Sequence, residues 1–123
     1  MQNFHTLIAW QKAHAIAVDL CRFAVTIPPR YVRLADQIIA SASSMPANLA
    51  EGCGRRSNAD RARFFDYTIG SASETEARLL ILRDLTLLDE VDADAYCTRI
   101  IEIRSMTHAL MVKTRSTTKN ERS

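Results

Sequence analysis

The stretch SSMPANLAEGCGRRS, residues 43–57, decides the fold because it marks the end of one helix and the start of the next. Before it, apolar residues recur every three or four positions, as they do along one face of a helix. Gly52 or Gly54 is the residue type that commonly follows the last turn of a helix. Ser57 or Asn58 can then cap a new helix. The stretch is therefore predicted to be a tight turn between two helices.

The same periodicity predicts helices on both sides of this turn. Apolar residues with helical spacing occupy residues 7–25, 34–49, 64–82 and 96–111, and no segment shows the alternation of a strand. The prolines of the sequence IPPR end the first segment, because proline lacks the N–H that a helix needs. Asp92 is a suitable N-cap for the last segment. Four helices are expected.

Short turns between long helices make sequential helices antiparallel neighbours. We therefore predict an all-α fold, an antiparallel up-down-up-down four-helix bundle with a kinked second helix. Residues 1–115 are assigned to the bundle. Residues 116–123, STTKNERS, lack apolar periodicity and are predicted to form a disordered polar tail.

Pro46 is the reason for expecting a kink. Its missing N–H leaves the carbonyl of Ala42 without a helical partner. Ser43 and Ser44 lie beside this break, where either can cap a restarted turn whose first positions tolerate proline.

Small side chains are expected to meet between the second and third helices. When the chain is folded back at the predicted turn, ASASS at 40–44 falls opposite TIGSAS at 68–73. Gly70 costs about 1 kcal/mol in a helix relative to alanine, so a close approach of the two helices would explain it. The alternative is that Ser and Ala are simply common helix residues.

Composition indicates one soluble domain without membrane contact. The chain has 123 residues, of which 47% are hydrophobic and 24% charged. Its apolar runs are far shorter than the roughly 20 residues of a membrane span, and no signal peptide is evident. The sequence has three widely spaced cysteines, Cys21, Cys53 and Cys97. This odd number and wide spacing favour reduced thiols over a disulfide framework. A cytoplasmic location is expected.

Catalytic and metal-binding patterns are absent from the sequence. No Glu-x-x-His pair for a di-iron bundle, no Cys-x-x-Cys and no glycine-rich phosphate loop occurs. His14 lies on the apolar face of the first helix and is expected to be a core residue. We predict no enzyme activity, no catalytic residue, no metal and no cofactor.

Charge is distributed unevenly between the two ends of the predicted bundle. The end with the first N-terminus, the second turn and the last C-terminus collects mostly basic residues, and the other end collects mostly acidic ones. A basic end suits phosphate groups of nucleic acids. Among the arginines that follow the second turn, no aromatic residue occurs before Phe64, so no base-stacking platform is predicted. The candidate nucleic-acid-binding residues are Arg55, Arg56, Arg61, Arg63, Lys113 and Arg115. The alternative is an ordinary solvated surface.

The sequence LLILRDLTLL, residues 79–88, is apolar around nearly the whole helix axis. A four-helix bundle covers only the inward stripe of each helix, so the remaining apolar side chains need another partner. We predict a subunit interface formed by Ile39, Leu80, Ile81, Leu85, Leu88 and Ile101.

Four short motifs in a fixed order carry a family resemblance. They are WQKA at 10–13, PAN at 46–48 followed by AEG at 50–52, and GSA at 70–72 followed by Glu74. With these, the chain resembles the four-helix-bundle family of 23S rRNA intervening-sequence proteins, to which the accessory proteins of diversity-generating retroelements are similar.

The resemblance extends from about Phe4 to Met111 and implies several properties. It implies a ring-like homopentamer without established enzymatic activity. The retroelement relatives bind nucleic acid and reverse transcriptase through basic surface. Members often carry arginine just after the Gln-Ile step, whereas here Gln37-Ile38 is followed by Ile39-Ala40, which makes this face apolar.

Two functional hypotheses follow. The first is a non-enzymatic homo-oligomer whose basic ends bind RNA or DNA phosphates. The alternative is a protein-interaction scaffold that binds another protein without binding nucleic acid. The expected partners are therefore further copies of the chain, RNA or DNA, or another protein.

Overall fold

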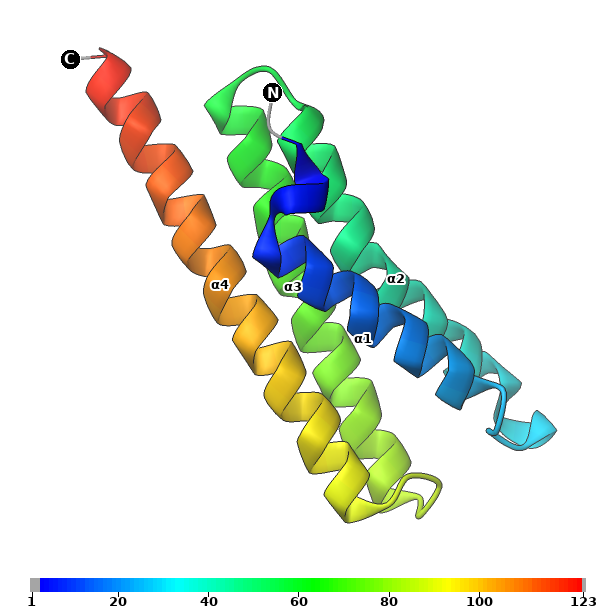
Figure 1. Cartoon of the computed structure of the whole chain (residues 1–123). Coiled ribbons are helices and arrows are strands. Elements are labelled where there is room, and N and C mark those ends of the chain that lie inside the picture. Colours follow the sequence, from blue (N-terminus) through cyan, green and yellow to red (C-terminus); the bar gives the residue numbers. More distant parts are fainter. Residues whose placement is uncertain (1–2, 123) are drawn as a thin grey trace.

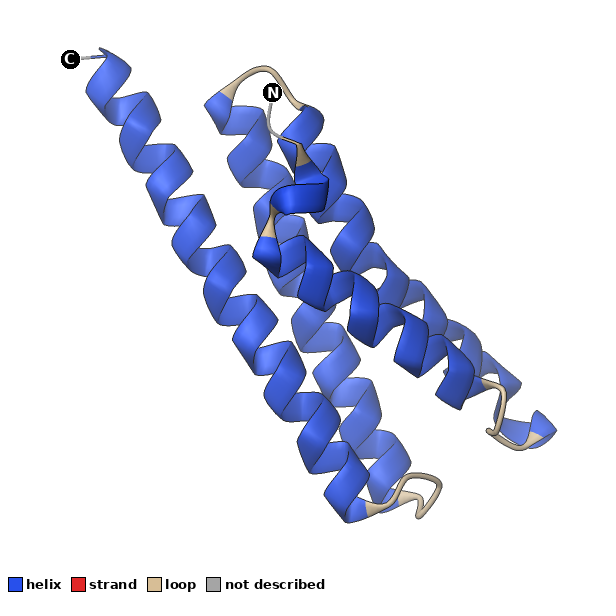
Figure 2. Ribbon diagram, in the orientation of Figure 1, coloured by secondary structure: helices blue, strands red, loops and turns tan. Residues whose placement is uncertain are grey.

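Four long helices form the described part of the molecule, and Figure 1 shows their arrangement. The computed structural model describes the backbone of residues 3–122 and the side chains of residues 3–117. The elements are η1 (Phe4–Thr6), α1 (Ile8–Ala24), η2 (Pro29–Tyr31), α2 (Val32–Gly54), α3 (Asn58–Asp84) and α4 (Glu90–Arg122). Figure 2 shows helices and loops but no strand in this described part. Sequential long helices run in opposite directions, which confirms the predicted up-down-up-down bundle (Figure 1).

The predicted turn between α2 and α3 is present and is capped as expected. Helix α2 ends at Gly54, and the hydroxyl of Ser57 accepts a hydrogen bond from the Asp60 N–H at 3.1 Å. The start of α4 differs from the prediction, since Asp89 rather than Asp92 caps it. Its carboxylate accepts from the Val91 N–H at 3.1 Å, and its carbonyl accepts from the Ala93 N–H at 2.8 Å.

Pro46 lies inside an uninterrupted helix. Helix α2 is continuous from Val32 to Gly54, so the predicted restarted turn is wrong. The Ser43 hydroxyl instead donates back to the Ile39 carbonyl at 2.6 Å, and the Ser44 hydroxyl accepts from the Asn48 amide at 2.9 Å. A bend of the axis at Pro46 stays a prediction.

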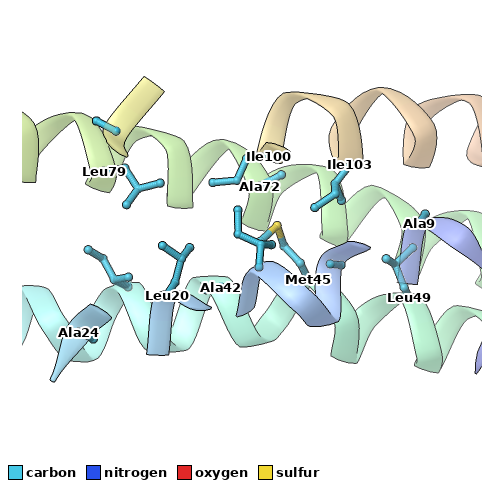
Figure 3. Packing of buried hydrophobic residues seen from close by; sticks show 14 of the residues in the cluster. Ala9, Leu20, Ala24, Ala42, Met45, Leu49, Ala72, Leu79, Ile100 and Ile103 are labelled. Atoms are coloured by element: carbon cyan, nitrogen blue, oxygen red, sulfur yellow. The ribbon is translucent and has the colours of Figure 1, made fainter. Parts of the chain in front are cut away.

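The core combines small and large apolar side chains in layers along the bundle axis (Figure 3). Alanines let the helix backbones approach, while larger side chains fill the remaining space. The labelled examples are Ala9, Leu20, Ala24, Ala42, Met45, Leu49, Ala72, Leu79, Ile100 and Ile103. His14 does not belong to this core, contrary to the prediction. It is exposed and stacks on Trp10 with ring centroids 4.9 Å apart, because Ala13 and Ala17 supply the inward face of α1 instead.

Hydroxyl groups connect α2 to α3 along the predicted register. The hydroxyls of Ser41 and Thr75 are hydrogen-bonded at 2.9 Å, and those of Ser44 and Ser71 at 3.0 Å. The small-residue segments therefore do lie opposite one another. Gly70 does not explain their approach, since it is exposed and a Cβ built on it would meet nothing within 4 Å.

Helix α4 continues to Arg122, beyond the domain boundary predicted at residue 115. The predicted disorder of residues 116–123 is not tested by this helix assignment and stays a prediction. Ser123 lies outside the described residues.

Among the described residues, no helix has both the length and the apolar character needed to cross a membrane.

Candidate nucleic-acid interface

The α2–α3 turn, the N-terminal segment and the C-terminal end of α4 lie at the same end of the molecule (Figure 1). The six basic residues predicted to bind nucleic acid belong to this end. Three further charged residues belong to this end by sequence, Lys119, Glu121 and Arg122, and their side chains lie outside the described residues. The remaining basic side chains differ in what they contact.

Arg61 is a structural residue of the turn. Its Nε donates to the Arg55 carbonyl at 2.8 Å, and its Nη1 donates to the Asn58 side chain at 3.1 Å. The Arg55 carbonyl lies just past the end of α2, where helical partners run out. Removing Arg61 would therefore disturb the turn as well as the surface charge.

Arg55 and Arg63 are both held against the ring of Phe64. Their guanidinium carbons lie 4.6 Å and 5.1 Å from the ring centroid, within cation–π distance. Arg55 also pairs with Glu51 at 3.6 Å, and Arg63 pairs with Asp60 at 3.3 Å. The Nε of Arg55 is buried and has no hydrogen-bond partner among the described residues.

Tyr67 completes this group of side chains. It lies one turn after Arg63, whose guanidinium carbon is 5.9 Å from the Tyr67 ring centroid. Its ring meets Phe64 edge to face, with centroids 5.4 Å apart and an interplanar angle of 83°. Tyr67 is 46% exposed. We call Arg55, Arg63, Phe64 and Tyr67 the arginine–aromatic cluster.

The sequence predicts no base-stacking platform, because no aromatic residue precedes Phe64 among these arginines, and this cluster was not identified from it. On a helix, Arg63 and Tyr67 are neighbours at a spacing of four. The turn then brings Arg55 back over the same face. The Arg63–Tyr67 spacing was the signal available in the sequence.

The other basic candidates are Arg56, which follows Arg55 in the turn, and Lys113 and Arg115 of α4. Arg56 is exposed and forms no ion pair with any described residue. Arg115 is exposed on α4, and Lys113 lines a groove of about 400 Å³ between α4 and residues 6–9. The six candidates therefore share an end of the bundle but differ in their contacts.

The predicted interface residues are partly exposed, with one exception. Leu88 is only 4% exposed and packs in the core, which contradicts its assignment to a subunit interface. Leu88 lies in the loop between α3 and α4, and in the same loop the backbone of Thr86 has a φ of 59°, in the left-handed region. The others remain accessible to different degrees: Leu80 is half-buried, and Ile39, Ile81, Leu85 and Ile101 are exposed.

No described residues form a group of three or more histidine, cysteine or acidic side chains able to hold a metal ion. Burial raises the pKa of the Cys53 thiol, and the positive charge of Arg61 opposes this only in part. Burial also raises the pKa of Cys97, with a further contribution from Glu76 and Asp94. Raised pKa values keep these thiols protonated and therefore unreactive.

A family model described as 23S rRNA-intervening sequence protein matches residues 5–109. The chain belongs to this family. No protein with a curated description matches the sequence. This member of the 23S rRNA-intervening sequence protein family is also similar to a solved structure from Bacteroides thetaiotaomicron, described as a protein of unknown function from the S23 ribosomal protein family.

That similarity concerns the fold. The two chains are 22% identical with a TM-score of 0.78, over 85% of this chain and 98% of the other. Neither the family description nor that of the solved structure names a reaction. The family assignment therefore agrees with the resemblance seen in the sequence. It does not assign an enzymatic activity to the chain.

Proposed function

We propose that this protein is a non-enzymatic, homo-oligomeric helical bundle that binds RNA or DNA phosphates through its basic end. The observation that carries the proposal is the crowding of Arg55, Arg56 and Arg63 at the α2–α3 turn. Arg56 forms no ion pair with a described residue, while the pairs of Arg55 and Arg63 are solvent-exposed. Exposed ion pairs contribute little, so phosphate can replace the carboxylates at small cost.

Self-association would multiply this basic end. Ile81 and Ile101 are 48% and 45% exposed on α3 and α4. On the α1 side, an apolar groove of about 490 Å³ runs between α1 and α2, and its lining includes Val18, Val25 and Pro46. These two features suit each other chemically, because both are apolar.

The positions of these features favour a contact between different faces of neighbouring copies. Within the described residues α1 packs against α2 and α4 but has no close backbone approach to α3, so α1 and α3 lie on a diagonal of the bundle. An apolar contact from the α3 face of one copy to the α1–α2 groove of the next is heterologous. Heterologous contacts close into rings or continue as filaments. A homopentamer, as the family resemblance implies, is our proposal for the closed form.

The salt dependence of RNA binding tests the proposed function. For wild type, the logarithm of the binding constant should fall linearly with that of salt concentration, by about 0.7 to 0.9 per phosphate contacted. The double variant Arg56→Ala, Arg63→Ala should bind more weakly and lower this slope by about two. The matched control is Arg30→Ala, Arg33→Ala, which removes the same charge from exposed positions at the other end.

Equal effects of the two double variants would contradict the proposed site. Absence of any wild-type binding would contradict the nucleic-acid function and favour the alternative, a scaffold that binds another protein. Sedimentation equilibrium tests the assembly separately: a mass equal to the monomer's 13.8 kDa at micromolar concentration would contradict it.

A further inference from the structure

The arginine–aromatic cluster has a feature that phosphate binding alone does not use. Phe65, the next residue on α3, is 1% exposed and packs in the core. Tyr67 in contrast is 46% exposed, although a tyrosine ring has a large apolar surface. Bundle packing therefore explains Phe65 and leaves much of the Tyr67 ring open to solvent.

The contacts around Tyr67 leave room for a planar ligand. The edge-to-face contact with Phe64 occupies at most one face of the Tyr67 ring. The guanidinium carbon of Arg63 is 5.9 Å from the ring centroid, well beyond the roughly 3.5–4.0 Å of stacked carbon atoms. The exposed Arg63 side chain can move aside to admit a flat ring onto Tyr67.

The arginines beside Tyr67 supply the second half of a nucleotide site. Arg55 and Arg63 lie over Phe64, within cation–π distance of its ring. Their Nη2 atoms pair with the solvent-exposed carboxylates of Glu51 and Asp60, and phosphate oxygens can accept hydrogen bonds from the same donors. Arg56, next in sequence to Arg55, adds an exposed positive charge. Positive groups and an exposed aromatic ring together characterise proteins that bind single strands.

We propose that Tyr67 stacks on an unpaired base of single-stranded nucleic acid while Arg55, Arg56 and Arg63 contact the flanking phosphates. This inference rests on the proposed function and narrows it to a substrate class. The base must be unpaired and unstacked, because neighbouring bases in a duplex cover both of its faces. Duplexes would then bind through the arginines alone.

Binding to a fluorescein-labelled 12-nucleotide RNA, to the DNA strand of the same sequence and to the corresponding duplex tests this by anisotropy. Tyr67→Ala should weaken single-strand binding by about 5- to 150-fold, the range for loss of one base–aromatic stack. Duplex binding and the salt slope should stay unchanged, because no charge is removed. Tyr67→Phe keeps the ring and is expected to bind single strands within about twofold of wild type.

The outcomes separate this inference from the proposed function. If the double variant Arg56→Ala, Arg63→Ala lowers the salt slope but Tyr67→Ala binds single strands as wild type does, stacking is overturned and phosphate binding stands. Equal weakening of single strands and duplex by Tyr67→Ala would also overturn stacking, as would a Tyr67→Phe variant as weak as Tyr67→Ala. If polyglutamate displaces the RNA as efficiently as unlabelled RNA does, the surface recognises charge only, and the base site is overturned.

Discussion

Gly52 of α2 lies directly against the ring of Phe65 of α3. A Cβ built on Gly52 would be 2.7 Å from Cε1 and 2.9 Å from Cδ1 of this ring, and 3.3 Å from the Arg61 carbonyl oxygen. Real Cβ atoms essentially never come within 3.0 Å of a heavy atom that is not part of their own or a neighbouring residue of the chain. The absence of a side chain at residue 52 thus allows the two helices to approach beside the turn that carries the arginine–aromatic cluster.

Gly52→Ala should destabilise the fold by about 1–3 kcal/mol, because an added methyl group overpacks the contact with Phe65. Gly70→Ala is the matched control, since that helical glycine is exposed and has open space around its Cα. It should stabilise the fold by about 1 kcal/mol through helix propensity. Urea unfolding of both variants measures the difference, and a Gly52→Ala protein as stable as Gly70→Ala would contradict the packing argument.

Helices and their order were predictable because periodicity depends on local sequence. The long apolar faces and the cap at Ser57 have direct sequence signals, and both are confirmed. Which glycine is crowded is not a local property. The sequence favoured Gly70 for a close approach, whereas the crowded glycine is Gly52, because the contact depends on where Phe65 points across the turn.

Errors about single side chains have the same origin. His14 was predicted to be buried because it has helical spacing with Trp10, yet the inward face of α1 runs through Ala13 and Ala17. Leu88 was assigned to the subunit interface because residues 79–88 were treated as one regular helix. The helix ends before Leu88, and Thr86, with its left-handed backbone, lies in the loop that follows. The arginine–aromatic cluster combines Arg55, from before the start of α3, with Arg63, Phe64 and Tyr67 of α3. Helical spacing alone does not predict that Arg55 lies over the same ring as Arg63.

The hydroxyl pair between Ser41 and Thr75 should stabilise the α2–α3 interface. Both residues are buried, and their oxygens are 2.9 Å apart. Thr75→Val keeps the shape but leaves Ser41 with a long bond of 3.5 Å to the Ile38 carbonyl, so we expect a loss of about 1 kcal/mol in unfolding free energy.

The double variant Ser41→Ala, Thr75→Val isolates this pair. Replacing both partners by apolar groups removes the unsatisfied hydroxyl, so the double loss should be smaller than the sum of the single losses by about 0.5–1 kcal/mol. Strict additivity of the two substitutions in urea unfolding would show that the hydroxyls do not stabilise each other.

The ion pair between Glu76 of α3 and Arg104 of α4 should stabilise the fold more than the pair between Lys12 of α1 and Glu102 of α4. Their N···O distances are similar, 2.8 Å and 2.9 Å, but the Glu76–Arg104 side chains are only 25% and 30% exposed, against 51% and 45% for Glu102 and Lys12. Less solvent screening strengthens the first pair. Glu76→Gln should cost about 1 kcal/mol and Glu102→Gln about 0.3 kcal/mol. Equal losses in low-salt urea unfolding would contradict this ranking.

Alkaline pH should destabilise the protein through Cys53 and Cys97. Burial raises the pKa of both thiols above their ordinary value of 9.0, so the native chain keeps protons that the unfolded chain releases. Each thiol's contribution is fully present below pH 9 and is lost as the pH rises through the native pKa. Between about pH 8 and pH 10, unfolding free energy should therefore fall more steeply for wild type than for Cys53→Ala, Cys97→Ala. The cavities in this variant lower stability by an amount that does not depend on pH. The comparison therefore concerns only the slope of unfolding free energy against pH. Parallel slopes for wild type and the variant would contradict the role of the thiols.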